Sequence, residues 1–220
     1  MHFITHPYTS GPNVSKVFTF LDMFSGIASI LHLMAISMER YFCVGWAIKH
    51  RNAPKYIYYI MVVIIWLLSA LVASIRLISP TLPQTDLTLL IVVVFFLLPL
   101  VVIVISYAAI WKIAITRMGN NPTKRSLKRE IRTASTIAFV IGFFFITWSP
   151  FFILQSVFVF CGGPCMFAGL TETLVFLKLL HYLNSAMNPV VYGVRIPEFR
   201  KTFKFILKKL YGPILSIARR

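Results

Sequence analysis

Long runs of apolar residues, separated by short polar segments, dominate the pattern along the chain. Each run holds about 18 or more mostly apolar residues, and a helix of about 20 such residues crosses the hydrocarbon core of a bilayer. The pattern therefore predicts an all-α membrane protein with five transmembrane helices. The five runs are Val17–Glu39, Tyr56–Ile78, Leu87–Ala114, Thr133–Phe160 and Thr171–Val194.

A different pattern follows the fifth run, where apolar residues recur at helical spacing among basic residues. Such a helix lies on the membrane surface and is attracted to the anionic lipid of the inner leaflet. Its apolar face consists of Phe199, Phe203, Ile206, Leu207 and Leu210. The chain therefore divides into an extracellular segment at 1–16, a five-helix transmembrane bundle at 17–194, and an amphipathic helix with a cytoplasmic tail at 195–220.

Composition and charge agree with a membrane protein and oppose a nucleic-acid partner. The chain is 58% hydrophobic, whereas soluble domains are about 45–50% apolar, and its mean hydropathy is +0.81. The net charge is +16, but 19 of the 22 lysines and arginines lie in alternate segments between the runs, at the adjoining ends of the runs, or after the last one. Because short Lys- and Arg-rich loops face the cytoplasm, we expect an extracellular N-terminus and a cytoplasmic C-terminus. A soluble core with a basic surface would not segregate charge in this way.

Charged residues within the first run or at its end are costly in a membrane unless they have a function. Asp22 and Arg40 are 18 residues apart, which is five helical turns, so both project from one face and stand about 27 Å apart. The simpler interpretations are that Asp22 pairs with a neighbouring polar residue and that Arg40 extends to the membrane interface. The fourth run adds Glu130, at a depth where it could pair with Arg40.

Aromatic residues in the fourth run form the second half of a candidate site. Trp148, Phe151 and Phe152 share a helical face around Pro150. Such aromatics are more often core packing, but opposite a carboxylate they can hold a cation by ring-face attraction. In the fifth run, the Tyr182 hydroxyl could donate to Asp22, and Lys178, one turn away, could reach the same carboxylate and compete with a bound amine.

Prolines and cysteines complete the candidate features. Pro99, Pro150 and Pro189 each remove a backbone hydrogen bond within a predicted span, so they are candidate hinges. Cys161 and Cys165 lie in a predicted extracellular loop and are candidates for a small disulfide, the alternative being two free thiols. The pattern contains no catalytic constellation, and we expect no metal and no cofactor.

Several short motifs occur in one order along nearly the whole chain. They are Glu39-Arg40-Tyr41, Trp66, Pro99 with Tyr107, Trp148-Ser149-Pro150, Asn188-Pro189-Val190-Val191-Tyr192, and Phe199 with its neighbours. In these motifs the chain resembles the rhodopsin-like (class A) G protein-coupled receptors. Within that family, residues 21–37 together with Phe151, Phe152 and Tyr182 resemble the biogenic-amine receptors.

The resemblance implies a partial seven-transmembrane-helix bundle that begins at the third helix of the family. It implies a receptor, not an enzyme, in the plasma membrane. An extracellular small-molecule ligand would place a protonated amine against Asp22, near Trp148, Phe151 and Phe152. The set implied for the activation switch is Glu39, Arg40, Tyr41, Tyr107, Glu130, Pro150, Asn188, Pro189 and Tyr192.

In that switch, Glu39 and Glu130 would hold Arg40 at rest, and ligand binding would shift the population towards an open form that admits a heterotrimeric G protein. Ile91, Val92 and Phe95 stand where catecholamine receptors often have serines. Two alternatives remain open: a class A receptor for a non-amine ligand, and a non-signalling membrane protein that associates with full-length receptors.

Overall fold

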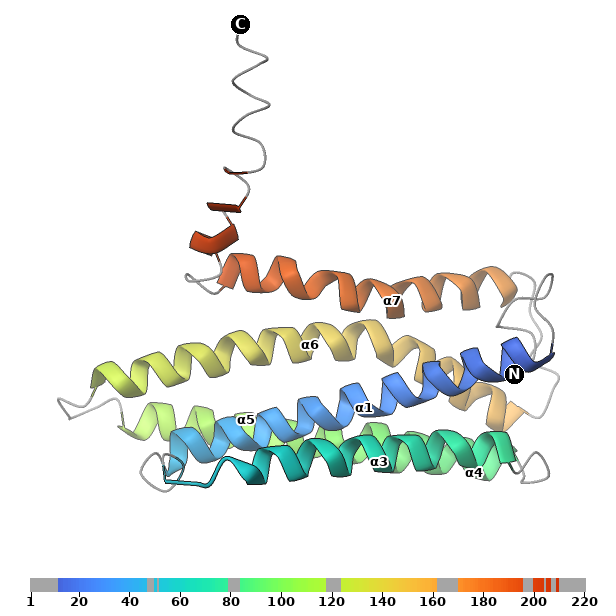
Figure 1. The fold of residues 1–220 in the computed structure, drawn as a ribbon, viewed down its shortest axis with the longest axis horizontal. Helices are drawn as coiled ribbons and strands as arrows, with labels where there is room; N and C mark the ends of the chain where they lie inside the picture. Colours follow the sequence, from blue (N-terminus) through green and yellow to red (C-terminus); the bar gives the residue numbers. More distant parts are fainter. Residues whose placement is uncertain are drawn as a thin grey trace, which may run out of the picture.

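In the computed structural model the chain forms a bundle of long helices lying side by side (Figure 1). The structure describes residues 12–46, 50, 52–78, 84–117, 124–161, 170–195, 200–203, 205–206 and 209, and within these ranges it contains no strand. The elements are α1 (Pro12–Gly45), α3 (Tyr56–Ile78), α4 (Gln84–Val92), the π-helical turn η1 (Val93–Leu97), α5 (Leu98–Arg117), α6 (Lys124–Cys161) and α7 (Leu170–Arg195).

Among the residues that the structure describes, four helical stretches are long and apolar enough to cross a membrane. They coincide with the first four predicted runs, which confirms the predicted all-α membrane class. The fifth run forms α7, whose 26 residues extend over roughly 39 Å, but its charged and polar side chains lower its hydropathy, so a fifth crossing stays a prediction. The four stretches are Lys16–Gly45, Tyr56–Ile75, Asp86–Thr116 and Glu130–Leu154.

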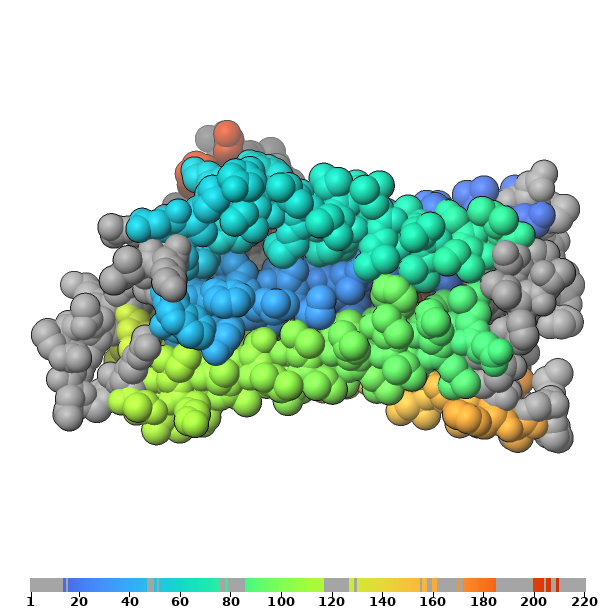
Figure 2. All heavy atoms as spheres, turned by 90° about the horizontal axis from the view of Figure 1, so that it is seen from below, coloured from blue at the N-terminus to red at the C-terminus, as the bar shows by residue number. Residues whose placement is uncertain are grey.

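Helix α1 is the central element of the bundle, because it packs against α3, α5 and α6. Figure 2 shows it between α3 and α5 when the bundle is seen from below. Helix α6 packs in turn against α4, α5 and α7. In the part of the chain that the structure describes, the backbone of α7 approaches only that of α6. Contact between α1 and α7 therefore depends on long side chains.

Within the described ranges, three clusters of buried side chains along α1 form the core. The first joins α1 to α3 and includes Ile27, Leu31, Ile65 and Val72. The second joins α1 to α5 and α6 and includes Ile30, Ile103, Phe144 and Trp148. The third joins the other end of α1 to α5 and α6 through Val44, Ile110 and Ala134.

Pro99 has the local effect that its chemistry predicts. A proline lacks the N–H that would bond the carbonyl four residues earlier, here that of Phe95. The chain accommodates the loss with the π-helical turn η1, in which the Leu98 N–H donates to the Val93 carbonyl. Phe95 and Phe96 are both buried in this turn, so the irregularity places two aromatic side chains in the core.

The segment after α7 is helical at the positions that the structure describes, 200–203, 205–206 and 209. Phe203, Phe205 and Ile206 are exposed there, which leaves apolar area available for lipid. Phe199, Leu207 and Leu210, three of the five residues expected on the apolar face, lie outside the described residues. The position of this helix on the membrane surface stays a prediction.

Candidate ligand-binding site and inner ion-pair network

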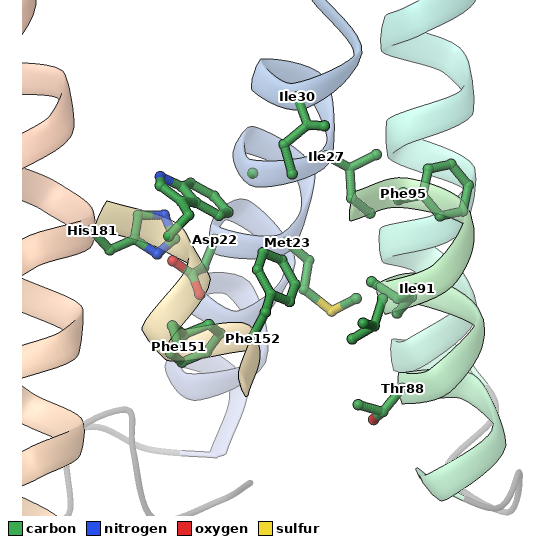
Figure 3. A pocket seen from close by; sticks show the side chains of 13 residues that line it. Asp22, Met23, Ile27, Ile30, Thr88, Ile91, Phe95, Phe151, Phe152 and His181 are labelled. Atoms are coloured by element: carbon green, nitrogen blue, oxygen red, sulfur yellow. The ribbon is translucent and has the colours of Figure 1, made fainter. Parts of the chain in front are cut away.

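A cavity of about 90 Å³ lies between α1, α4, η1, α6 and α7. Figure 3 shows His181 beside Asp22 on one side, and Thr88, Ile91 and Phe95 on the other. The predicted aromatic set, Trp148, Phe151 and Phe152, is part of the lining. Asp22 is the one ionised side chain among the lining residues. The cavity is therefore an apolar space with a single carboxylate at one wall.

The Asp22 carboxylate is paired with Lys178 of α7, whose Nζ donates to Asp22 Oδ2. The side chains of Asp22 and Lys178 are only 26% and 13% exposed, and isolated charges at that depth are costly. Lys178 Nζ also lies 4.8 Å from the centroid of the Phe151 ring, a cation–π contact. The structure thus contains the internal salt bridge that the spacing of α7 permitted.

Tyr182 does not occupy the place that the sequence suggested for it. Its side chain is 61% exposed, and it is absent from the lining of the cavity. The reason is the rotation of α7, whose buried stripe against α6 is formed by Leu177, His181 and Asn184. Tyr182 is one residue, or about 100°, from His181, so its ring lies outside this buried stripe. His181 takes its place in the lining.

Sequence reasoning missed His181 as a site residue, although the stripe at i, i+4 and i+7 was available as a signal. Its ring centroid lies 3.6 Å from that of Trp148. His181 Nδ1 and Trp148 Nε1 are buried and have no hydrogen-bond partner among the described residues. Buried polar atoms usually have partners, so both atoms keep an unused capacity for hydrogen bonding.

The indole of Trp148 is held by stacking on Phe144, with the ring centroids 4.8 Å apart and the planes within 19°. Phe152 continues the stack at 5.9 Å, and Phe96 from η1 lies 4.3 Å from Phe152. Aromatic pairs at such distances stabilise a defined arrangement. The floor of the cavity is therefore a packed aromatic layer that joins η1 to α6.

Gly26 allows α1 to approach this layer closely. A Cβ atom at Gly26 would lie 2.8 Å from Trp148 Cη2, and the stacked indole has little room to move. We expect Gly26→Ala to lower the free energy of unfolding by about 1.5 kcal/mol, as overpacking does. Gly142→Ala is the matched control, because a Cβ there meets nothing within 4 Å. Denaturant unfolding of the purified variants measures both, and equal stabilities would contradict the close contact.

At the opposite end of α1, Arg40 lies in a network of ion pairs. Its Nε and Nη2 donate to both oxygens of Glu39, the second at 2.7 Å. Its Nη1 lies 3.6 Å from Glu130 Oε2 of α6. The predicted geometry of Arg40 between Glu39 and Glu130 is therefore present. Cys43, a free thiol, donates to Glu130 at 3.3 Å.

Two further residues extend this network: His50, outside the predicted spans, and Tyr58, near the start of α3. His50 Nε2 donates to Glu39 Oε1 at 2.8 Å, and the Tyr58 hydroxyl lies 3.0 Å from the same nitrogen. Sequence reasoning missed both, because neither the apolar runs nor the helical period describes the path of the chain from α1 to α3. Glu39 therefore contacts both Arg40 and His50.

Among the remaining predicted switch residues, the structure describes the side chains of Tyr41, Tyr107 and Pro150. The Tyr107 hydroxyl is buried and lacks a hydrogen-bond partner within the described ranges. Tyr41 packs edge-on against Trp46 at 5.4 Å, and Pro150 lies inside α6. Asn188, Pro189 and Tyr192 belong to α7, but their side chains lie outside the described residues.

The structure describes only one of the two cysteines of the predicted disulfide. Cys161, at the end of α6, is disulfide-bonded. Cys165 lies outside the described residues, so the pairing of Cys161 with Cys165 stays a prediction.

Comparison with known proteins places this chain in a family. Residues 1–192 match the model of the 7 transmembrane receptor (rhodopsin family). The octopamine receptor of Heliothis virescens is 38% identical over 82 residues, which are 37% of this chain and 17% of that receptor. The melatonin receptor type 1B of Rattus norvegicus is 29% identical over 216 residues, covering 90% of this chain and 59% of that receptor.

A third relative, the D(5)-like dopamine receptor of Takifugu rubripes, is 26% identical over 234 residues, covering 84% of this chain and 50% of that receptor. The matched segment is less than two thirds of the length of each of these relatives.

Proposed function

The chain belongs to the rhodopsin family of seven-transmembrane receptors, and from that premise we propose that it binds an extracellular ligand and activates a heterotrimeric G protein. As a member of this family it is a multi-pass plasma-membrane receptor and not an enzyme. The charge pattern supports an extracellular N-terminus and a cytoplasmic C-terminus. This orientation puts the cavity of Asp22 on the extracellular half and Arg40 at the cytoplasmic end.

We propose that the ligand carries a protonated amine that binds Asp22. The observation that carries this proposal is the single carboxylate in an otherwise apolar, aromatic cavity. A carboxylate neutralises an ammonium group, and the faces of Phe151 and Trp148 attract it. That several relatives are receptors for octopamine, dopamine and tyramine supports the same ligand class.

We propose that the ion pairs of Arg40 hold the resting state. A ligand that binds the active conformation more tightly shifts the population towards it, and the Pro150 hinge of α6 then carries Glu130 away from Arg40. The Tyr107, Asn188, Pro189 and Tyr192 positions, which match family motifs, belong to the same switch. This movement would expose Arg40 to a G protein on the cytoplasmic side.

Amine-evoked nucleotide exchange on a purified G protein tests the proposal. The chain, reconstituted in lipid, should respond to at least one of octopamine, dopamine or tyramine. Asp22→Asn should lower the potency of that amine about tenfold, the value of a single charge-assisted hydrogen bond. The loss is limited because Lys178 already neutralises part of the carboxylate's charge.

The matched control is Asp86→Asn, which removes an exposed carboxylate in the first turn of α4. The amine should have the same potency on Asp86→Asn as on the unsubstituted chain. An amine response that Asp22→Asn leaves undiminished would rule out Asp22 as the anchor. The absence of any ligand-dependent or basal exchange with a panel of G proteins would refute the receptor function of this chain.

A further inference from the structure

The carboxylate at the cavity wall does not stand alone, and its partner changes which ligands the site can hold. Asp22 and Lys178 form an ion pair between α1 and α7. Lys178 is more buried than Asp22, with 13% of its side chain exposed, and it lies against the ring of Phe151. Any ligand that binds Asp22 must therefore accommodate the Lys178 ammonium as well.

A simple amine accommodates it poorly. If the amine takes the Asp22 carboxylate, Lys178 loses its counter-charge, and two cations then lie close to one carboxylate. A partly buried cation that loses its partner is strongly disfavoured, and like charges at short range repel. A simple carboxylic acid has the opposite defect, because it neutralises Lys178 and leaves Asp22 unpaired.

A zwitterion has neither defect, because its ammonium pairs with Asp22 while its carboxylate pairs with Lys178. One ion pair is replaced by two, and no charge is left without a partner. We propose that the site takes a free amino acid with an apolar side chain, whose α-ammonium binds Asp22 and whose α-carboxylate binds Lys178. This inference rests on the proposed function and specifies the chemical class of the amine.

The lining of the cavity suits the side chain of such a molecule. Apart from Asp22, Thr88 and His181 its lining is apolar or aromatic, including Ile27, Phe95 and Phe152, which suits an aliphatic or aromatic side chain. Its volume of about 90 Å³ is below the roughly 150 Å³ of a cavity that holds benzene. An aromatic side chain therefore enters only if the cavity widens, and insertion of the ligand's head group would widen it by separating Asp22 from Lys178.

His181 supplies a polar atom next to the ion pair. Its Nδ1 is buried, with the residue only 8% exposed, and has no partner among the described residues. His181 also lines the cavity, and Figure 3 shows its ring beside the Asp22 carboxylate. An α-amino acid brings hydrogen-bonding groups to this place, so it can satisfy an atom that an apolar ligand would leave unpaired.

Equilibrium binding to the purified full chain in lipid nanodiscs tests the inference without any signalling step. The probes are radiolabelled L-phenylalanine and phenethylamine, which differ only in the carboxylate. The chain should bind L-phenylalanine at least about tenfold more tightly, the value of one charge-assisted bond. Unlabelled N-acetyl-L-phenylalanine, which lacks the ammonium, should compete at least about tenfold more weakly than L-phenylalanine.

Substitution of Lys178 should reverse this preference. In Lys178→Met the amine no longer meets a second cation, so phenethylamine should bind more tightly than L-phenylalanine. Lys178→Arg keeps the charge and should keep the preference for the amino acid. Lys112→Met is the matched control, because Lys112 is exposed in α5, away from the cavity, and it should bind both probes as the unsubstituted chain does.

Tighter binding of phenethylamine than of L-phenylalanine by the unsubstituted chain would overturn the inference, and so would binding of neither probe. Equal preference in Lys178→Met and the unsubstituted chain would overturn it as well. These results would leave the proposed function standing, because amine-evoked nucleotide exchange is measured separately. Conversely, selective amino-acid binding without nucleotide exchange would support the inference and contradict the signalling role.

Discussion

Asp22→Asn is expected to lower the free energy of unfolding by about 3 kcal/mol, the lower end of the range for breaking a buried ion pair. The substitution leaves the Lys178 ammonium, 13% exposed and against Phe151, without its counter-charge. The lower end applies because Asp22 itself keeps 26% of its side-chain exposure. Unfolding of the purified protein in detergent, followed by the fluorescence of its tryptophans, measures the change.

The double variant Asp22→Asn/Lys178→Met distinguishes the effect of an unpaired Lys178 charge from the effect of a changed side chain at Asp22. Replacing both members of an ion pair by neutral groups of similar volume is often close to neutral, so the double variant should recover most of the lost stability. Glu172→Gln, an exposed carboxylate in the first turn of α7, should change stability by less than about 0.5 kcal/mol. A double variant as unstable as Asp22→Asn would show that Asp22 stabilises the bundle through other contacts.

Much of the fold follows from hydropathy, because a bilayer requires long apolar helices with internally paired backbones. The predicted run Tyr56–Ile78 has the same bounds as α3. Helix α1 is longer than its run, extending from Pro12 to Gly45. The excess has a physical reason: a helix does not end where the hydrocarbon ends, and charged or polar residues can continue it into the interface.

The candidate site could be predicted as far as single helices define it. The periodicity of one helix places Trp148, Phe151 and Phe152 on the same face, and all three line the cavity. It does not fix how α7 rotates against α6. For that reason the sequence could name both Lys178 and Tyr182 as partners of Asp22, and only packing of Leu177, His181 and Asn184 against α6 decides between them.

The inner network shows a second limit of sequence reasoning. Arg40 and Glu39 are adjacent in the sequence, and Glu130 lies at a similar depth, so their association was predictable. His50 reaches Glu39 through a chain path that turns between α1 and α3. Such a path depends on tertiary packing, including the edge contact between His50 and Tyr58, and no periodicity reports it.

Glu39→Gln is expected to raise the ratio of active to resting receptor about 30-fold, and this shift raises basal nucleotide exchange on the G protein. Glu39 is the main partner of Arg40 and also accepts from His50. Charge-assisted, bidentate pairs of this kind contribute about 2 kcal/mol, and a shift of that size in a two-state equilibrium is about 30-fold. The substitution destabilises the resting state alone, because we propose that Arg40 separates from Glu39 on activation.

A graded series makes this prediction sharp. Glu130→Ala should raise basal exchange by less, since Glu130 Oε2 lies 3.6 Å from Arg40 Nη1 and is 33% exposed, where ion pairs are worth about 1 kcal/mol or less. Asp86→Asn, at the opposite end of the bundle, should leave basal exchange unchanged. All variants are compared at equal amounts of reconstituted protein, by basal exchange without ligand. The expected effect on basal exchange is therefore largest for Glu39, smaller for Glu130 and absent for Asp86, an order that follows from distance and burial alone. Equal basal exchange in Glu39→Gln and Asp86→Asn would show that these ion pairs do not restrain the receptor.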